Sequence, residues 1–394
     1  VASWVGLGWS LNAGGVITRM INGTPDEGGF LNEFQNNARA ATESRSGWLT
    51  TYGMHPALLE CSSYPQMTPD GSIFNPCEQN NLRDVPSCIE WMFDANNGFL
   101  DSEPDMFNYN FGGYMGKFIF QNGRPVVLGS DKLKIDFASD LSGFTITTPD
   151  GVKYFFGGDG ATEETFFCNN GQMPSDWNKR STSYYLKRVE SMNGGHYIEF
   201  LYETERFNTT SVLGHTRAVN CSASLNPSAQ IGVDVCEEKT GESFIPSVPG
   251  NNNTIGKRLT HILTSSGKIS VNFVANHVRQ DLLTFGLYAG VANTESKALD
   301  EIIIKEGSRE RTFVLKKSYF ISRTSGFGFN YPDEAKRLKL DEVYEKGGAE
   351  TRNTYVFEYN ESDALPRRNS LARDHWGYYN GNDAARGLIP SGTR

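Results

Sequence analysis

The sequence predicts an all-β protein in which twisted antiparallel β-hairpins repeat to form a curved sheet, a shell wall or a sandwich-like or barrel-like array. Three observations lead to this fold class. Aromatic residues make up 12% of the 394 residues and glycine occurs 41 times, a composition that favours strands joined by tight turns. One hairpin pattern occurs four times between residues 186 and 359. No segment has the apolar spacing of a long amphipathic helix.

The recurring pattern is an apolar residue, a second apolar residue three positions on, a glycine eight positions after the first, and an alternating apolar strand. In the four copies, the first apolar residue and the turn glycine are Leu186 and Gly194, Leu259 and Gly267, Leu299 and Gly307, and Leu340 and Gly348. We expect an incoming strand, a glycine turn with positive φ, and an outgoing strand that buries one face. The later copies start 40 and 41 residues apart and the first interval is 73, so the polar stretch 207–253 is interpreted as an insertion.

Further hairpins are predicted between residues 117 and 157. Alternating apolar runs there are separated by Asn122-Gly123 and by Pro149-Asp150-Gly151. Such sequences form tight turns because asparagine, aspartate and glycine tolerate the backbone conformations that two-residue connections need. Asp150 and Gly151 are therefore expected to join two strands.

The chain divides into four expected segments. Residues 1–100 contain a glycine-rich opening and a disulfide-bridged loop region, and residues 101–180 contain antiparallel hairpins. Residues 181–373 hold the four repeats with the insertion at 207–253, and residues 374–394 begin a following region. The absence of an initiator methionine and of a signal-peptide core is what we expect of a piece of a longer chain.

Six cysteines lack the CxxC spacing of zinc and thioredoxin-like sites, so disulfides are the preferred interpretation. Cys221 and Cys236 flank a short loop inside the polar insertion and form the candidate pair, with free buried thiols as the alternative. For the other four cysteines three pairings stay open. These are Cys61, Cys77, Cys88 and Cys168.

The opening segment combines four glycines with two tryptophans. A dinucleotide-binding loop would need a helix after the glycines, whereas residues 16–21 are β-branched and predict a strand. We expect the glycines to permit close strand packing or a bulge, and the tryptophans to be buried anchors. The residues concerned are Trp4, Gly6, Gly8, Trp9, Gly14 and Gly15.

Charge and hydropathy argue against a nucleic-acid partner and against a membrane span. The net charge of −9 argues against a nucleic-acid surface, which needs clustered lysine and arginine. No stretch approaches the roughly 20 apolar residues that span a bilayer. Neither a nucleic-acid partner nor a membrane span is expected.

Three groupings that contain carboxylates are candidates for chemical sites. Asp374 and His375 are adjacent, so in a strand their side chains point to opposite faces and packing is the preferred role. Residues 101–105 carry three carboxylates that could hold Ca²⁺, although capping of a turn is preferred. Glu163 and Glu164 are neighbours and lack the separation of a glycosidase pair. No catalytic, cofactor or metal site is expected, and the protein is predicted not to be an enzyme.

Three blocks carry a resemblance to a known family. They are residues 3–19 (SWVGLGWSLNAGGVITR), residues 103–120 (EPDMFNYNFGGYMGKFIF) and residues 374–381 (DHWGYYNG). They resemble the region upstream of the repeat core in Rhs/YD-repeat proteins and the start of the B components of Tc toxin complexes. The matching motif positions beyond the opening segment are Asp105, Phe107, Gly116, His375 and Trp376. Tandem YD repeats themselves are absent from this chain.

The resemblance implies a non-enzymatic structural module of a large bacterial protein that is secreted or held at the cell surface, with type IX secretion as the usual route. Such a module contributes to a β-shell or scaffold that encloses or delivers a C-terminal toxin or effector. Its partners are the rest of the same polypeptide and the secretion machinery. The alternative is a cell-surface adhesin, or a glycan-binding or protein-binding module, that uses residues 207–253 and 40–100 as binding loops.

Overall fold

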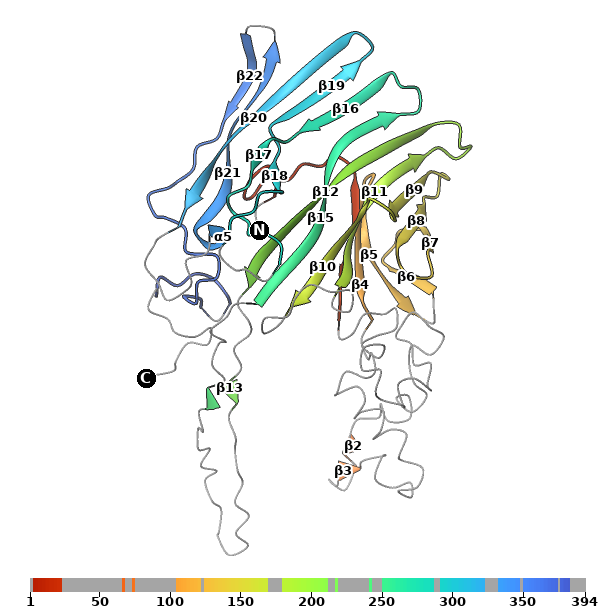
Figure 1. Cartoon of the computed structure of the whole chain (residues 1–394). Coiled ribbons are helices and arrows are strands. Elements are labelled where there is room, and N and C mark those ends of the chain that lie inside the picture. Colours follow the sequence, from red (N-terminus) through yellow and green to blue (C-terminus); the bar gives the residue numbers. More distant parts are fainter. Residues whose placement is uncertain are drawn as a thin grey trace, which may run out of the picture.

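The protein is almost entirely β-strand. The computed structural model describes residues 3–22, 66–67, 73–74, 104–121, 124–168, 179–211, 217–218, 241–242, 250–286, 291–322, 332–347, 350–374 and 376–382. Within these ranges the one helix is α5 (Pro332–Ala335), and sixteen strands form a single antiparallel sheet. The predicted all-β class is therefore confirmed (Figure 1).

The strands of the large sheet are β1 (Gly15–Met20), β4 (Met106–Phe111), β5 (Tyr114–Gln121), β6 (Arg124–Leu128), β7 (Lys134–Phe137), β8 (Gly143–Thr147), β9 (Lys153–Gly157), β10 (Thr162–Cys168), β11 (Lys179–Glu190), β12 (Tyr197–Ser211), β15 (Gly250–Thr264), β16 (Ile269–Val274), β19 (Glu301–Glu306), β20 (Arg309–Ile321), β21 (Lys336–Gly347) and β22 (Glu350–Val356). Three small ribbons are separate from it: β2 (Gln66–Met67) with β3 (Ile73–Phe74), β13 (Arg217–Ala218) with β14 (Gly241–Glu242), and β17 (His277–Val278) with β18 (Lys297–Ala298).

The four sequence repeats form four hairpins that lie side by side in chain order. They are β11–β12, β15–β16, β19–β20 and β21–β22, and neighbouring hairpins join through the pairs β12–β15, β16–β19 and β20–β21 (Figure 1). Gly194, Gly267 and Gly307 have φ angles of 69°, 66° and 57° at their turns, a conformation that glycine adopts without a Cβ penalty. Gly348 lies outside the described residues. The repeat is thus one structural unit used four times.

The repeated leucines give the sheet a continuous apolar face. The first apolar residue of each copy is buried, with at most 7% of its surface exposed: Leu186, Leu259, Leu299 and Leu340. Phe200, Phe273 and Leu315 from the outgoing strands are buried beside them. Because alternate residues of a strand point to the same face, all four hairpins contribute to one core.

Two shorter arms of the sheet close on each other through aromatic side chains. β1, β4, β5 and β6 extend from one edge of β11, and β9, β8 and β7 from the other. Phe107 of β4 stacks on Phe118 at 4.9 Å and meets Phe144 of β8 edge-on at 5.5 Å. Phe120 meets Phe137 at 4.8 Å. This end of the protein is therefore two layers deep.

The turn between β8 and β9 has the geometry that its sequence favours. The amide of Thr148 donates to the carbonyl of Val152 at 3.0 Å, and Gly151 has a φ of 82°. The hydroxyl of Thr148 donates to the carboxylate of Asp150, which fixes the turn from the side-chain side.

The predicted insertion at 207–253 begins and ends as strand rather than loop. The β12–β15 pairing continues as far as Ser211 opposite Gly250, so the ribbon extends into the insertion from both sides. Most of the rest of the insertion, with Cys221 and Cys236, lies outside the described residues. The same holds for the expected bridged region at 30–100, apart from β2 and β3. Cys168 is in β10, and its pairing stays a prediction.

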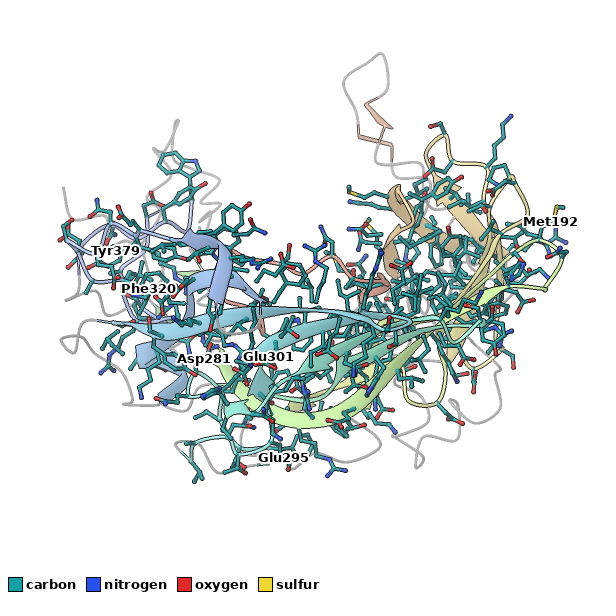
Figure 2. All side chains as sticks on the ribbon, turned by 90° about the horizontal axis from the view of Figure 1, so that it is seen from above. Met192, Asp281, Glu295, Glu301, Phe320 and Tyr379 are labelled. Carbon is teal, nitrogen blue, oxygen red and sulfur yellow. The ribbon has the colours of Figure 1, made fainter. Side chains whose placement is uncertain are left out.

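Strands from the expected segments 1–100, 101–180 and 181–373 are hydrogen-bonded within the same sheet. Seen from above, this sheet is curved, with Met192 at one end and Phe320 and Tyr379 at the other (Figure 2). No helix in the described part of the chain has the length and hydrophobicity needed to cross a bilayer.

Candidate functional site

The glycine-rich opening segment forms a loop that lies on the repeat hairpins. The amide of Leu7 donates to the carbonyl of Leu338 at 2.8 Å, and the amide of Leu299 donates to the carbonyl of Trp4 at 2.9 Å. Gly8, with a φ of 78°, adopts a backbone conformation that favours glycine. The opening segment therefore binds two hairpins that lie about three hundred residues later in the chain.

Two of the opening glycines are required by close approach. A Cβ on Gly6 would lie 3.0 Å from the amide nitrogen of Leu340, and the φ of Gly6 is 144°. A Cβ on Gly15 would lie 2.6 Å from the Cβ of Phe111 on the paired strand β4. Gly14, with a φ of 137°, lies against the ring of Phe200. These contacts fit the expected role in close strand packing.

The expectation that both tryptophans are buried was wrong for Trp9. Its ring centroid is 4.4 Å from that of Phe357 and its Nε1 donates to the Tyr359 hydroxyl at 2.9 Å, yet 38% of the residue is exposed. One side of the indole packs on the sheet and the rest faces outward. Trp4 is partly buried, with its ring 6.1 Å from Phe273. Val5 between them is buried.

Asp105 forms a buried ion pair with Arg19. Its Oδ2 lies 2.5 Å from a terminal nitrogen of Arg19, and both side chains are fully buried. Its Oδ1 accepts the amide of Asn22 at 2.9 Å. Asp101 and Glu103 lie outside the described residues. Across the described ranges, no three His, Cys, Asp or Glu side chains are grouped as metal ligands.

Gly116 of β5 leaves room for a buried tyrosine. A Cβ there would lie 2.3 Å from the hydroxyl oxygen of Tyr109, which donates to Asp131 at 2.7 Å. Burial, together with the hydrogen bond and the charge of Asp131, raises the pKa of Tyr109. The motif glycine thus shapes the aromatic layer.

The C-terminal block forms a turn around Asp374. The carboxylate accepts the amides of Trp376 at 2.9 Å and Tyr378 at 2.8 Å, as a turn-capping aspartate does. His375 lies outside the described residues. Trp376 is 78% exposed.

A cleft of about 520 Å³ lies between the opening segment and strands β11, β12 and β15. Its walls also include the β4–β5 turn. The polar residues that line it are Ser3, Asn12, Asn110, Tyr185, Tyr202, Glu205, Lys257, Arg258 and Arg279. No local sequence pattern marks these residues as a site, because they meet only when strands distant in sequence pair.

The charged groups of the cleft form a partly satisfied network. Arg258 donates to Glu203 at 2.5 Å, and Arg279 pairs with Asp281 at 2.8 Å. The Nε of Arg258 is 3.8 Å from Oε2 of Glu205, too long for a hydrogen bond, and neither atom has a hydrogen-bond partner among the residues that the structure describes. Burial raises the pKa of Glu205, in spite of the opposing charges of Arg279 and Arg258.

A second carboxylate, Glu163 of β10, lies next to this network. It accepts hydrogen bonds from Thr182 at 3.1 Å, from Ser183 at 2.9 Å and from Tyr185 at 3.0 Å. Burial and the nearby charge of Glu163 raise the pKa of Tyr185. A Cβ on Gly256 would lie within 4 Å of both Glu163 and Glu205. The sequence places Glu163 beside Glu164, whereas the fold brings it towards Glu205.

The raised pKa of Glu205 predicts a pH dependence of stability. The unfolded chain ionises this carboxyl near the ordinary value of 4.5 and the folded protein does so only at higher pH. The free energy of unfolding therefore falls as the pH rises from the pKa of Glu205 in the unfolded chain to its pKa in the folded protein. Above that pH, Glu205 causes no further loss. Glu205→Gln cannot ionise, so its stability relative to wild type should increase over that interval.

Urea unfolding of both proteins at steps from about pH 4 to about pH 8 measures this difference. Glu306→Gln, at the exposed turn of β19–β20, is the control and should follow wild type. A constant difference between Glu205→Gln and wild type at all pH values would contradict the prediction.

No protein-family model matches the chain, and no curated protein matches it. The resemblance to Rhs/YD-repeat proteins thus depends on the three sequence blocks, and the family stays a prediction. The described geometry consists of an all-β sheet of repeated hairpins, an opening segment laid on them, and one polar cleft between the two.

Proposed function

We propose that this protein is a non-enzymatic structural module of a large secreted or surface-held bacterial protein of the Rhs/YD-repeat type. In this role it contributes a curved β-wall to a scaffold or shell that encloses or delivers a C-terminal toxin or effector. The partners are neighbouring parts of the same polypeptide. The repeated hairpins and the three sequence blocks support the proposal.

The single observation that carries this proposal is the open sheet edge at β22, the outgoing strand of the last repeat. The outgoing strands β12, β16 and β20 each pair with the next hairpin, whereas among the described strands β22 pairs with β21 alone. β22 also carries Tyr355 and Val356, which are 65% and 68% exposed. An open edge with apolar side chains is a template for another strand, and isolated proteins usually protect such edges.

The proposed mechanism is continuation of the wall by strand addition. A further hairpin that pairs with β22 would extend both the hydrogen-bond ladder and the row of buried side chains, as each earlier repeat does for the one before. The opening segment would act as a brace, because it holds two hairpins together from one face. Such an assembly gives a rigid curved surface and needs no reaction centre.

Self-association of the isolated chain tests the open edge. Because β22 has no second neighbour among the described strands, two copies should pair through it, and sedimentation equilibrium should show concentration-dependent association. The double variant Tyr355→Lys and Val356→Lys should abolish that association, since lysine on an edge strand opposes pairing.

The matched control is the double variant Met192→Lys and Val291→Lys, which changes exposed apolar residues that are 74% and 53% exposed away from β22. It should associate like wild type. A chain that stays monomeric at every concentration, or equal association of the two double variants, would contradict the proposed continuation. The adhesin alternative was assigned to loops that lie mostly outside the described residues, and it stays a prediction.

A further inference from the structure

The geometry points to a binding function in addition to the architectural one: we propose that the cleft beneath the opening segment binds a saccharide unit of an uncharged glycan. The inference depends on the cleft and not on the open edge at β22. Failure of either proposal therefore leaves the other to be judged by its own experiment.

The size of the cleft fits a small organic ligand. Its volume of about 520 Å³ lies within the range of roughly 300–1,000 Å³ typical of such sites. The walls come from the opening segment, the β4–β5 turn and three neighbouring strands, so the cleft is formed by the folded sheet itself. A preformed site of this kind binds without the cost of ordering a loop.

The cleft offers hydrogen-bond donors and acceptors in mixed order. The amides of Asn12 and Asn110 supply both, and Lys257 supplies a donor. Tyr185 donates its hydroxyl hydrogen to Glu163, and Tyr202 donates its own to the carbonyl of Leu186 at 2.7 Å. Both phenolic oxygens therefore keep acceptor capacity. A ligand with alternating hydroxyl groups matches such a lining.

The unsatisfied pair in the cleft wall points to a hydroxyl in particular. Among the described residues, the Nε of Arg258 is a donor without an acceptor and Oε2 of Glu205 is an acceptor without a donor, and the two atoms are 3.8 Å apart. Both atoms are buried, so a ligand hydroxyl must displace the side chains around them to accept from the first and donate to the second. Arg258 is 8% exposed, so satisfying its buried Nε removes a real desolvation cost.

The same pair disfavours charged ligands. A phosphate or carboxylate in the cleft would meet the carboxylate of Glu205, and a cation would meet Arg258, Arg279 and Lys257. A purely apolar ligand would leave the polar lining without partners. An uncharged, hydroxylated ligand avoids all three costs.

Apolar surface for a sugar ring is also present. Trp4, which is partly buried, lines the cleft, and aromatic rings pack against the C–H face of a pyranose. Gly14, Gly112 and Gly113 line it without side chains, so their backbone groups stay within reach of a ligand. One flat apolar face and a hydroxylated rim are the two features that distinguish sugars from other small polar molecules.

Isothermal titration calorimetry of the full chain tests the proposal. The probes are four uncharged pentasaccharides, with β-1,4-glucose, β-1,4-N-acetylglucosamine, β-1,4-xylose and α-1,4-glucose units, and inorganic phosphate as the anionic comparison. At least one pentasaccharide should bind saturably, with a dissociation constant between about 1 μM and about 1 mM. Phosphate should not bind in the cleft.

Substitutions of cleft residues test whether the binding occurs in the cleft. Asn12→Ala and Asn110→Ala change exposed lining residues that the fold tolerates, and each should weaken binding at least about fivefold. Glu205→Gln keeps the shape of the side chain and should weaken binding by a similar factor. Asn193→Ala, at the exposed β11–β12 turn away from the cleft, is the control and should bind like wild type.

Several results would overturn the inference. They are no saturable binding of any pentasaccharide, binding that Asn12→Ala, Asn110→Ala and Glu205→Gln leave unchanged, or phosphate binding that the same variants remove. The second result would place a glycan site elsewhere on the chain, and the third would make the cleft an anion site.

Discussion

Replacing Asp105 by asparagine is expected to lower the free energy of unfolding by about 3–5 kcal/mol. Asp105 and Arg19 are both fully buried and 2.5 Å apart, so the variant removes the carboxylate charge from beside the guanidinium of Arg19 inside the protein. Removing one partner of a buried ion pair costs more stability than the pair itself contributes. Urea unfolding followed by circular dichroism measures the loss.

The chain provides a matched control for this experiment. Lys134 and Asp136 form an ion pair of 2.8 Å whose side chains are 74% and 53% exposed. Asp136→Asn should change stability little, because exposed pairs contribute only about 0–1 kcal/mol. The double variant Arg19→Met and Asp105→Leu, which removes both charges, should recover much of the loss. Equal effects of Asp105→Asn and Asp136→Asn would contradict the burial argument.

Truncating Phe107 to alanine is expected to cost about 3–5 kcal/mol. Its ring is fully buried between Phe118, Phe120 and Phe144, at centroid distances of 4.9, 5.5 and 5.5 Å. Removing it leaves a cavity between the two aromatic layers, and the rigid strands on either side can close only part of it. Thermal and urea unfolding both report this change.

Met115→Ala, on the neighbouring strand β5, is the comparison for Phe107. Met115 is 77% exposed, so its truncation should alter stability by no more than about 0.5 kcal/mol. Phe107→Leu should fall between the two variants, because leucine fills part of the ring's volume. A loss for Phe107→Ala no larger than that for Met115→Ala would show that the aromatic layers do not form the core at this end.

The repeated hairpins could be predicted because their signals are local. Apolar alternation fixes which face of a strand is buried, and a glycine such as Gly267 marks the turn, so strand, turn and strand are encoded within about twenty residues. The similarity of the four copies also predicted that they lie together. The extension of β12 and β15 into the insertion was not predicted. The strands pair there through backbone groups, and their polar side chains do not show the apolar alternation that marks a strand.

The cleft could not be predicted from sequence for a different reason. Glu163, Glu205 and Arg258 belong to strands β10, β12 and β15, whose order in the sheet departs from their order in the chain. Register shifts, such as the one between Leu201 and Tyr202, further change which side chains face each other. Arg19 and Asp105 are 86 residues apart in sequence, so their ion pair could not be predicted either. Long-range pairing determines these sites, and no local pattern records it.

The contact between the opening segment and the last two hairpins has a consequence for synthesis. Leu7 is synthesised more than three hundred residues before Leu338, whose carbonyl its amide bonds to. At a translation rate of roughly 5–20 residues per second, the growing chain exposes its row of leucines for tens of seconds before that segment can be seated. We therefore expect the nascent polypeptide to be prone to aggregation during this time, because the contact with Leu338 can form only after the final repeat emerges.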